Sequence, residues 1–242
     1  MSPRLATVHT WAFAIGSGTL TGDLAQRYAG YDLVVIDGQE VTKRQVATLH
    51  RGSALVLSYL DAGTIEPYRP WFRRAKRYRL DYWKQWGEWY ANVDARGYRK
   101  LIVGVARSFE RKGLDGLFLD NTDMIETHPK QAPGMRRLVA ALAKLVHRRS
   151  GFLFAQNGAD VAGPILRYLD GWNREDIGTD RSALRDLRAM HAHGLLTLAT
   201  GYVRQANSPA VSRDIRLACK AGALPFVSNL ELTRIPQPPP HC

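Results

Sequence analysis

Two carboxylic acids, Asp120 and Glu175, each follow a short segment that is typical of a β-strand. Asp120 ends the apolar run 115–120, which fits a parallel strand covered on both faces, and Glu175 ends the weaker run 169–175. A pair of carboxyl groups can hydrolyse a glycosidic bond, because one protonates the leaving oxygen while the other attacks as a nucleophile or activates water. Glycoside hydrolysis is therefore the first chemistry that these residues suggest.

Further acids lie at the ends of other predicted strands. Asp37 and Asp61 each close an apolar run, Glu66 follows in the next loop, and Asp123 lies just beyond Asp120. Since parallel strands bring their C-terminal ends to one rim, we expect these acids to surround the pair. There they would hydrogen-bond sugar hydroxyl or amino groups and shift the pKa values of the pair. Any one of them alone could instead be a helix cap or a salt-bridge partner.

Aromatic side chains near the predicted strand ends fit the same hypothesis. Sugar rings stack on the flat faces of such side chains, so Tyr59, Trp172 and Tyr202 are candidate substrate contacts. A second group follows the third predicted strand and consists of Trp83, Trp86, Trp89 and Tyr90. We interpret that second group as packing, because large aromatic residues also fill protein interiors.

Predicted strands and helices alternate along the whole chain. Helices are indicated by apolar residues at three- and four-residue spacing, most clearly over 134–149 and 97–112. The predicted strands cover 7–15, 31–37, 54–60, 115–120, 152–156, 169–175, 195–203 and 224–228. Eight strands with intervening helices in about 250 residues predict a single α/β domain, a (β/α)8 TIM barrel, with an open doubly wound sheet as the alternative.

The composition limits the remaining possibilities. We expect one domain over 1–235 and a Pro-rich tail over 236–242 that hangs off the surface. The 34 basic and 22 acidic residues give a formal charge of +12, which we interpret as a solvated outer face because no nucleic-acid motif accompanies it. No stretch could span a bilayer, and no signal-peptide core is apparent. Cys219 and Cys242 do not form a disulfide framework, and we expect Cys219 in the core.

Motifs for cofactors and metal ions are missing from the sequence. Gly16-Ser17-Gly18 resembles the start of a dinucleotide loop, but Thr21 stands where the third glycine is required. No phosphate-loop signature occurs, and His191 and His193 are spaced so that they do not share a helix face. We therefore expect neither a cofactor nor a metal ion in the chemistry.

Several stretches, in this order, resemble glycoside hydrolase family 114, the endo-α-1,4-polygalactosaminidase-like barrels. They are YDLVVID, LSYLDAGTIEPYRPWF, WGEWYANVDARGYRKLI, GLDGLFLDNTD, QNG, LDGWNREDI and GYVRQANSPAVSRDIRLACKAGALPFVSNLEL, within 31–235. The resemblance implies an endo-acting barrel that hydrolyses α-1,4-linked galactosamine or N-acetylgalactosamine polymers without a metal, outside the cell or in its envelope. By position, the family's catalytic acids fall on Asp120 and Glu175, and Asn157 of the QNG stretch joins the substrate contacts. We expect a monomer that binds polysaccharide and neither nucleic acid nor a membrane.

The placement of the two acids on the fourth and sixth strands is similar to that in retaining α-galactosidase barrels. Asp120, at the end of a buried strand, is then the expected nucleophile, and Glu175, with its longer side chain, the general acid/base. Asp61 and Thr64 depart from the family pattern, which leaves a different glycan or a non-catalytic glycan-binding barrel as alternatives. Because deacetylated galactosamine polymer is cationic, we expect a negative mouth in a positive outer shell.

Overall fold

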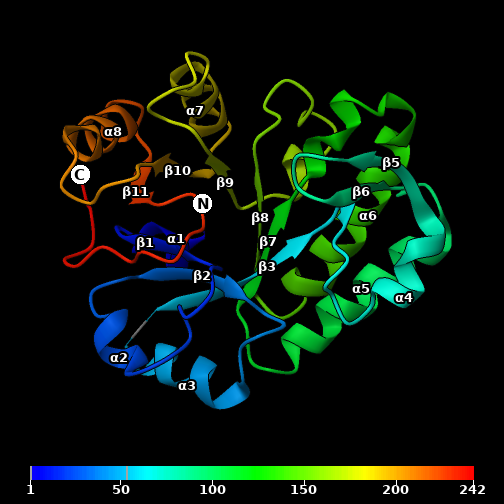
Figure 1. Cartoon of the computed structure of the whole chain (residues 1–242), viewed down its shortest axis with the longest axis horizontal. Helices are drawn as coiled ribbons and strands as arrows, with labels where there is room; N and C mark the ends of the chain where they lie inside the picture. The colour runs from blue at the N-terminus through cyan, green and yellow to red at the C-terminus, as the bar shows by residue number, and fades with distance from the viewer. Residues whose placement is uncertain (1, 53) are drawn as a thin grey trace.

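The computed structural model describes residues 2–52 and 54–242, and its centre is a barrel of eight parallel strands (Figure 1). The strands are β1 (Trp11–Ala14), β2 (Leu33–Asp37), β3 (Leu55–Asp61), β7 (Gly116–Asp120), β8 (Phe152–Gln156), β9 (Gly171–Arg174), β10 (Leu196–Tyr202) and β11 (Leu224–Ser228). They are neighbours in sequence order, and every hydrogen-bonded pair is parallel, so all their C-terminal ends lie at one end of the barrel. The predicted (β/α)8 barrel is confirmed, and the doubly wound alternative is wrong because that topology reverses the strand order.

Helices return the chain from one strand to the next and surround the barrel (Figure 1). They are α1 (Pro3–Ala6), α2 (Leu24–Arg27), α3 (Lys43–Arg51), α4 (Phe72–Ala75), α5 (Arg96–Glu110), α6 (Ala132–His147), α7 (Ala183–Ala192) and α8 (Pro209–Lys220), with short 3₁₀ turns η1 (Lys76–Tyr78), η2 (Thr122–Glu126), η3 (Pro129–Gln131) and η4 (Leu166–Tyr168). The predicted stripe of α6 faces inward, since Leu138 and Leu142 are fully buried and Arg136 is exposed. The sequence did not predict α1, and the strand predicted over 7–15 is reduced to β1.

Local sequence determines where several helices begin. At the start of α3, Thr42 Oγ1 accepts a hydrogen bond from the Gln45 backbone N–H (3.3 Å), and the Gln45 side chain accepts one from the Thr42 N–H (2.8 Å). Ser208 caps α8 in a simpler way, and Pro209 occupies the first turn, where no N–H is needed. Such caps satisfy backbone donors that a helix leaves unpaired at its start.

Aromatic side chains fill the inside of the barrel. Trp11 and Phe13 of β1, Phe118 of β7 and Phe226 of β11 are at most 1% exposed. Their ring centroids lie 4.9 Å apart for Phe13 and Phe118, and 5.5 Å apart for Trp11 and Phe226. The barrel is therefore a packed core that supports its rim, rather than a pore.

The barrel closes between β1 and β11 through single contacts instead of a ladder of hydrogen bonds. The Trp11 indole N–H donates to the Leu224 carbonyl oxygen (2.9 Å), and the Gly16 N–H donates to the Leu232 carbonyl oxygen (3.2 Å). A Cβ at Gly16 would lie 2.1 Å from the Glu231 carbonyl oxygen, so this position accepts no side chain without rearrangement. The glycine that resembles part of a dinucleotide loop thus serves closure of the barrel.

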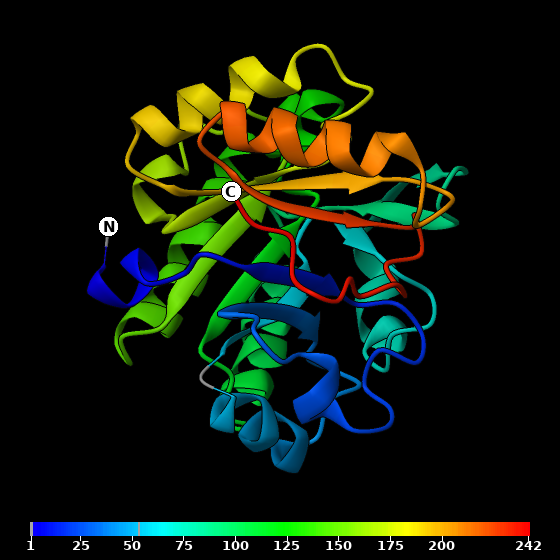
Figure 2. The ribbon, with the colours of Figure 1, turned by 90° about the vertical axis from the view of Figure 1, so that its left-hand side faces the viewer.

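The aromatic-rich excursion after β3 forms a small second sheet. It contains β4 (Thr64–Ile65), β5 (Arg79–Trp83) and β6 (Glu88–Ala91), which pair antiparallel in the order β4-β6-β5. We call β5, β6 and their connecting turn 84–87 the hairpin. In Figure 2 the strand arrows of the barrel point toward the end where the hairpin lies. An insertion at this end is placed to shape a site on the C-terminal rim.

The C-terminal tail is attached to the barrel, contrary to the expectation that it hangs free. The Tyr31 hydroxyl donates to the Pro236 carbonyl oxygen (2.6 Å), and the Gln237 amide donates to the Arg27 carbonyl oxygen (2.7 Å). Cys219 of α8 forms a disulfide with Cys242 across a separation of 23 residues. The sequence did not predict this single disulfide, which forms because the docked tail brings Cys242 back to α8. No helix in the described ranges is long and apolar enough to cross a membrane.

Candidate active site

A cavity of about 460 Å³ opens at the C-terminal end of the barrel, which we call the mouth. Strand ends, the hairpin and the segment 230–232 contribute to its lining. The predicted site residues that line it are Asp37, Tyr59, Glu66, Asp120, Asp123, Asn157, Glu175 and Tyr202. Its volume lies within the range that is usual for small-molecule sites. The fold therefore gathers most of the predicted residues, which are distant in the sequence, at one place.

Asp120, the last residue of β7, is held by three donors. Tyr59 donates its hydroxyl to Oδ2 (2.7 Å), while the Gln156 amide (2.6 Å) and the Asn121 backbone N–H (2.7 Å) donate to Oδ1. The Gln156 amide is itself oriented, because its oxygen accepts a hydrogen bond from Asn173 (3.2 Å). Burial raises the pKa of Asp120, and the three donors oppose that rise by stabilising the carboxylate.

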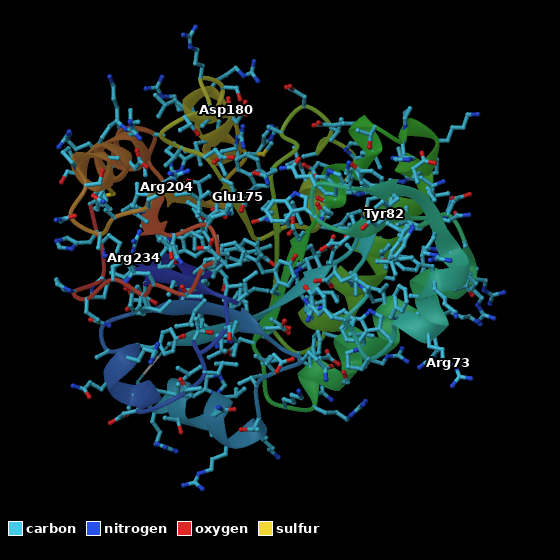
Figure 3. The ribbon with its side chains drawn as sticks, in the orientation of Figure 1. Arg73, Tyr82, Glu175, Asp180, Arg204 and Arg234 are labelled. Carbon is cyan, nitrogen blue, oxygen red and sulfur yellow. A yellow bond between two sulfur atoms is a disulfide. The ribbon has the colours of Figure 1, made fainter. Side chains whose placement is uncertain are left out.

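Glu175, directly after β9, has its own pair of donors. The Asn157 amide donates to Oε2 (2.6 Å), and the Tyr202 hydroxyl donates to Oε1. The amide oxygen of Asn157 accepts hydrogen bonds from the Glu175 backbone N–H (3.2 Å) and from Arg174 (3.3 Å). Those two contacts fix the orientation of the amide, so that its NH₂ group must point toward the carboxylate. The position of the Glu175 carboxylate is therefore fixed by its hydrogen-bond partners. Glu175 lies near the middle of the view in Figure 3.

The ionisation of Glu175 depends on its neighbour Asp120. Burial raises the pKa of Glu175 to about 7, and the negative charge of Asp120 is the next cause of that rise. The negative charge of an ionised Asp120 thus favours the protonated form of Glu175, which keeps its proton until near neutral pH. An ionised carboxylate beside a protonated carboxylic acid is the combination that glycoside hydrolysis by two carboxyl groups requires.

Asp37 and Glu66 lie in the mouth but are paired with a buried arginine. Arg69, whose side chain is 4% exposed, donates to Asp37 Oδ2 (2.6 Å) and to both oxygens of Glu66 (2.6 and 2.8 Å). Tyr68 donates its hydroxyl to the same Glu66 oxygen that accepts from the Arg69 NH2 group. Burial still raises the pKa of Glu66, although the neighbouring guanidinium opposes the rise. Arg69, Asp37 and Glu66 thus form an ion-paired group in the lining of the mouth, and the two acids have few lone pairs left to bind a sugar.

Asp61 and Trp172 support the mouth from beneath. Asp61 accepts hydrogen bonds from Gly63 N–H (3.0 Å), from Thr64 and from the Asn121 amide (2.6 Å). Trp172 is fully buried, and its indole N–H donates to the Asn157 carbonyl oxygen (2.9 Å). The contact between Trp172 and substrate that we expected is therefore excluded, because a buried ring has no face to offer.

Asp123 and Glu88 also belong to the acidic lining. Burial and the charge of Asp120 raise the pKa of Asp123 to about 7. Glu88, on the hairpin, was not among the predicted residues; its pKa is also raised to about 7, mainly by burial. Oxygen atoms of Asp61, Glu66 and Glu88 lie within 4.8 Å of one another, so these three could together surround a cation.

Three residues of the mouth were not predicted from the sequence, namely Gln156, Arg69 and Glu88. Gln156 ends β8 directly before the QNG asparagine, and it could have been found as a polar residue at a predicted strand end. Arg69 and Glu88 lie in the excursion after β3, where no periodic pattern indicated which side chains point inward. Only the folded hairpin and the docked loop place those two at the mouth.

The charge of the mouth is opposite to that of the whole chain. Eight described lining residues are acids, namely Asp37, Glu66, Glu88, Asp120, Asp123, Glu175, Asp176 and Glu231, and the basic residue among the lining is Arg69. The formal charge of the chain is +12, and basic residues such as Arg73 lie at its periphery (Figure 3). The arrangement agrees with the expected negative mouth in a positive shell, and it favours cationic ligands.

Solved structures of glycoside hydrolases have the same fold. Ega3 of Aspergillus fumigatus, in complex with galactosamine, is 18% identical with a TM-score of 0.77, covering 97% of this chain and 95% of that one. The glycoside hydrolase domain of PelA from Pseudomonas aeruginosa is 20% identical with a TM-score of 0.80, covering 93% and 96%. An α-galactosidase of Thermus thermophilus is 12% identical with a TM-score of 0.65, covering 95% of this chain and 58% of that protein.

No curated protein sequence matches the chain. A family model does match, over residues 2–234, which includes every strand of the barrel and every acid of the mouth. A match of this extent assigns the chain to its family independently of the structural likeness. The protein belongs to glycoside hydrolase family GH114.

Proposed function

We propose that the protein hydrolyses α-1,4-linked galactosamine- or N-acetylgalactosamine-containing polysaccharide, within the polymer chain and with retention of anomeric configuration. The observation that carries the proposal is the Asp120 and Glu175 pair at one mouth, because the charge of the first acid helps to keep the second protonated. Asp120 is the nucleophile and Glu175 the general acid/base.

The reaction has two steps in this assignment. In the first, an Asp120 oxygen attacks the anomeric carbon while Glu175 gives its proton to the glycosidic oxygen, and the bond to the leaving chain breaks. In the second, Glu175 takes a proton from water, and the water oxygen displaces Asp120 from the anomeric carbon. Tyr59 and Gln156 hold the nucleophile in place throughout.

Two features support an amino-sugar polymer as substrate. The described lining of the mouth holds eight acidic residues and one arginine, an excess that favours a cationic chain, and the similar Ega3 structure was solved with galactosamine. A second hollow of about 340 Å³ adjoins the mouth and shares Asp123 and Asn157 with it. A polymer could thus extend on both sides of the scissile bond, which supports endo cleavage.

The Cys219–Cys242 disulfide supports the expected location outside the reducing cytosol, where such bonds persist. A polymeric substrate of this kind would be met there.

The test is product analysis on α-1,4-linked galactosamine polymers of defined acetylation. Mass spectrometry of early products should show a spread of oligomer lengths, because endo cleavage cuts at internal bonds. Proton NMR should show the α-anomer first, since retention conserves the configuration of the substrate. Release of monomers alone would contradict endo action, and the β-anomer first would contradict retention. Products from a different glycan only would assign the barrel to that glycan, and binding without turnover would favour the non-catalytic alternative.

A further inference from the structure

The hairpin presents two chemically different faces. Tyr82 of β5 pairs with Trp89 of β6, and Trp83 pairs with Glu88. Because side chains alternate along a strand, the second pair points to the opposite side from the first. Trp83 and Glu88 line the mouth, whereas Tyr82 (labelled in Figure 3) does not.

The face toward the mouth carries three aromatic rings in contact, Trp83, Tyr90 and Trp86, which we call the platform. The Trp83 ring stacks on Tyr90, with centroids 5.2 Å apart and an angle of 11° between the planes. Trp86, in the turn of the hairpin, meets Trp83 edge to face at 6.4 Å, lines the mouth and is 51% exposed. An aromatic ring that is held at one edge and open on a face can stack on the C–H face of a sugar ring.

Glu88 lies on the same face of the hairpin, and one of its carboxylate oxygens can accept a further hydrogen bond. Its Oε2 lies 2.6 Å from Thr64 Oγ1, whose single proton is shared with Asp61 Oδ2 (2.5 Å), and across residues 2–52 and 54–242 its Oε1 makes no hydrogen bond or ion pair. Glu66, by contrast, has both oxygens occupied by Arg69. Burial and the nearby charges of Glu66 and Asp120 penalise the ionised form of Glu88. A cation bound in the mouth would relieve that penalty.

We propose that Trp86 and Glu88 form a subsite that takes a 2-amino sugar unit in its ammonium form. The sugar ring stacks on Trp86, and the ammonium group donates to Glu88 Oε1. This subsite lies on the hairpin rather than at the Asp120 and Glu175 pair, so it selects the sugar of a neighbouring unit in the polymer. The inference rests on the proposed function for its ligand class, and it makes Glu88 the residue that distinguishes a free amine from an N-acetyl group.

Binding measured without turnover tests the subsite separately from catalysis. The Asp120→Asn variant is titrated calorimetrically with α-1,4-linked galactosamine oligomers and with their fully N-acetylated counterparts, at pH 6.5 and low salt. Adding Glu88→Gln should weaken binding of the amine oligomer by at least about tenfold, as loss of a charge-assisted hydrogen bond does. The same change should leave binding of the N-acetylated oligomer within about twofold, because a neutral amide does not depend on the charge.

Two controls use the same hairpin. Asp81→Asn removes a negative charge from β5 at a residue that does not line the mouth, and Tyr82→Ala removes an aromatic ring from the outer face. Neither should alter the affinity for the two oligomers. Trp86→Ala should weaken binding of both oligomers, because stacking does not depend on the amine.

The outcomes separate the subsite from the proposed reaction. Equal weakening of both oligomers by Glu88→Gln, or no weakening, overturns the subsite even if the wild-type protein cleaves the polymer. Selective weakening supports the subsite even if no polymer is cleaved, in which case the proposed hydrolysis fails alone. Tight Ca²⁺ binding that Glu88→Gln abolishes would make a metal ion the occupant of the three-carboxylate cluster and would overturn the ammonium assignment.

Discussion

The two ends of the barrel both carry acids next to strands, but the acids are used differently. At the N-terminal end, Asp32, Asp115 and Asp170 each directly precede a strand. Each accepts a hydrogen bond from a backbone N–H of the neighbouring barrel strand or of the residue just before that strand. The donors are Thr10 for Asp32 (3.0 Å), Val56 for Asp115 (2.9 Å) and Leu153 for Asp170 (2.8 Å). Asp115 and Asp170 also meet basic partners, which include Arg4 and His147.

At the C-terminal end the acids meet one another. Asp120, Asp123 and Glu175 each have a raised pKa, with burial as the first cause, and the charge of Asp120 adds to the rise for the other two. An acid that accepts backbone donors stabilises the strand pair, whereas acids crowded in a cleft disfavour their own ionisation. The acids that directly precede strands are thus structural, whereas the C-terminal rim holds both structural acids, such as Asp37 and Asp61, and the crowded acids around Asp120 and Glu175.

The largest effect should come from the C-terminal end. Asp120→Asn and Glu175→Gln should each lower kcat by about 10²–10⁴-fold, the range that general acid–base groups contribute. Neither substitution should lower the stability at pH 8. Burial raises the pKa of each acid in the folded protein, so the stability that the acid contributes is present at low pH and is lost as the pH rises through the folded pKa. Initial rates and thermal unfolding at pH 8 would measure both effects. A near-normal rate in either variant would remove that residue from the catalytic pair.

The disulfide lies near the N-terminal end, where α8 finishes just before β11 begins. Its removal by Cys219→Ser should lower the free energy of unfolding by about 2–4 kcal/mol, as closing a loop of this size predicts. The value of kcat should stay unchanged, because the mouth is at the other end. Denaturant unfolding with and without reductant measures the loss, and reductant should have no effect on the variant. An unchanged unfolding free energy would show that the docked tail needs no covalent attachment.

A third change removes one of the structural acids. Asp115→Ala leaves the Val56 N–H and the Arg4 and His50 side chains without their acceptor, so stability should fall by about 1–3 kcal/mol while kcat is retained. Denaturant unfolding and initial rates check this. Glu40→Gln, at an exposed acid that does not line the mouth, is the control and should change neither quantity. If Asp115→Ala lowered kcat without lowering stability, the division between the two ends would be wrong.

The smallest effect should be a shift in the pH profile. Tyr202→Phe removes a hydroxyl that stabilises the Glu175 carboxylate, so the pKa of Glu175 should rise. Glu175 acts as an acid only while protonated, and the alkaline limb of the kcat profile, near pH 7 in the wild type, should therefore move to higher pH. Tyr82→Phe on the outer hairpin face should leave the limb in place. A limb that moves to lower pH would remove Glu175 from the role of general acid.

The sequence by itself determined the alternation of strands and helices, the single barrel, the acids that end β2 and β7, and the acid that follows β9. Those features depend on residues close together in the chain, such as the apolar run before Asp120 or the stripe of α6, so local periodicity is enough to find them. The resemblance then placed the catalytic acids on the same two residues.

Only the tertiary structure decided which of those acids are free. Arg69 reaches Asp37 across 32 residues, Tyr59 reaches Asp120 across 61, and the tail returns to α8 across 23. Trp172 turned inward beneath Asn157, and Glu88 turned into the mouth on a hairpin that no sequence pattern had oriented. Such contacts join segments whose separation along the chain carries no periodic signal, so the pairing and burial of each side chain follow from how the strands and loops pack together.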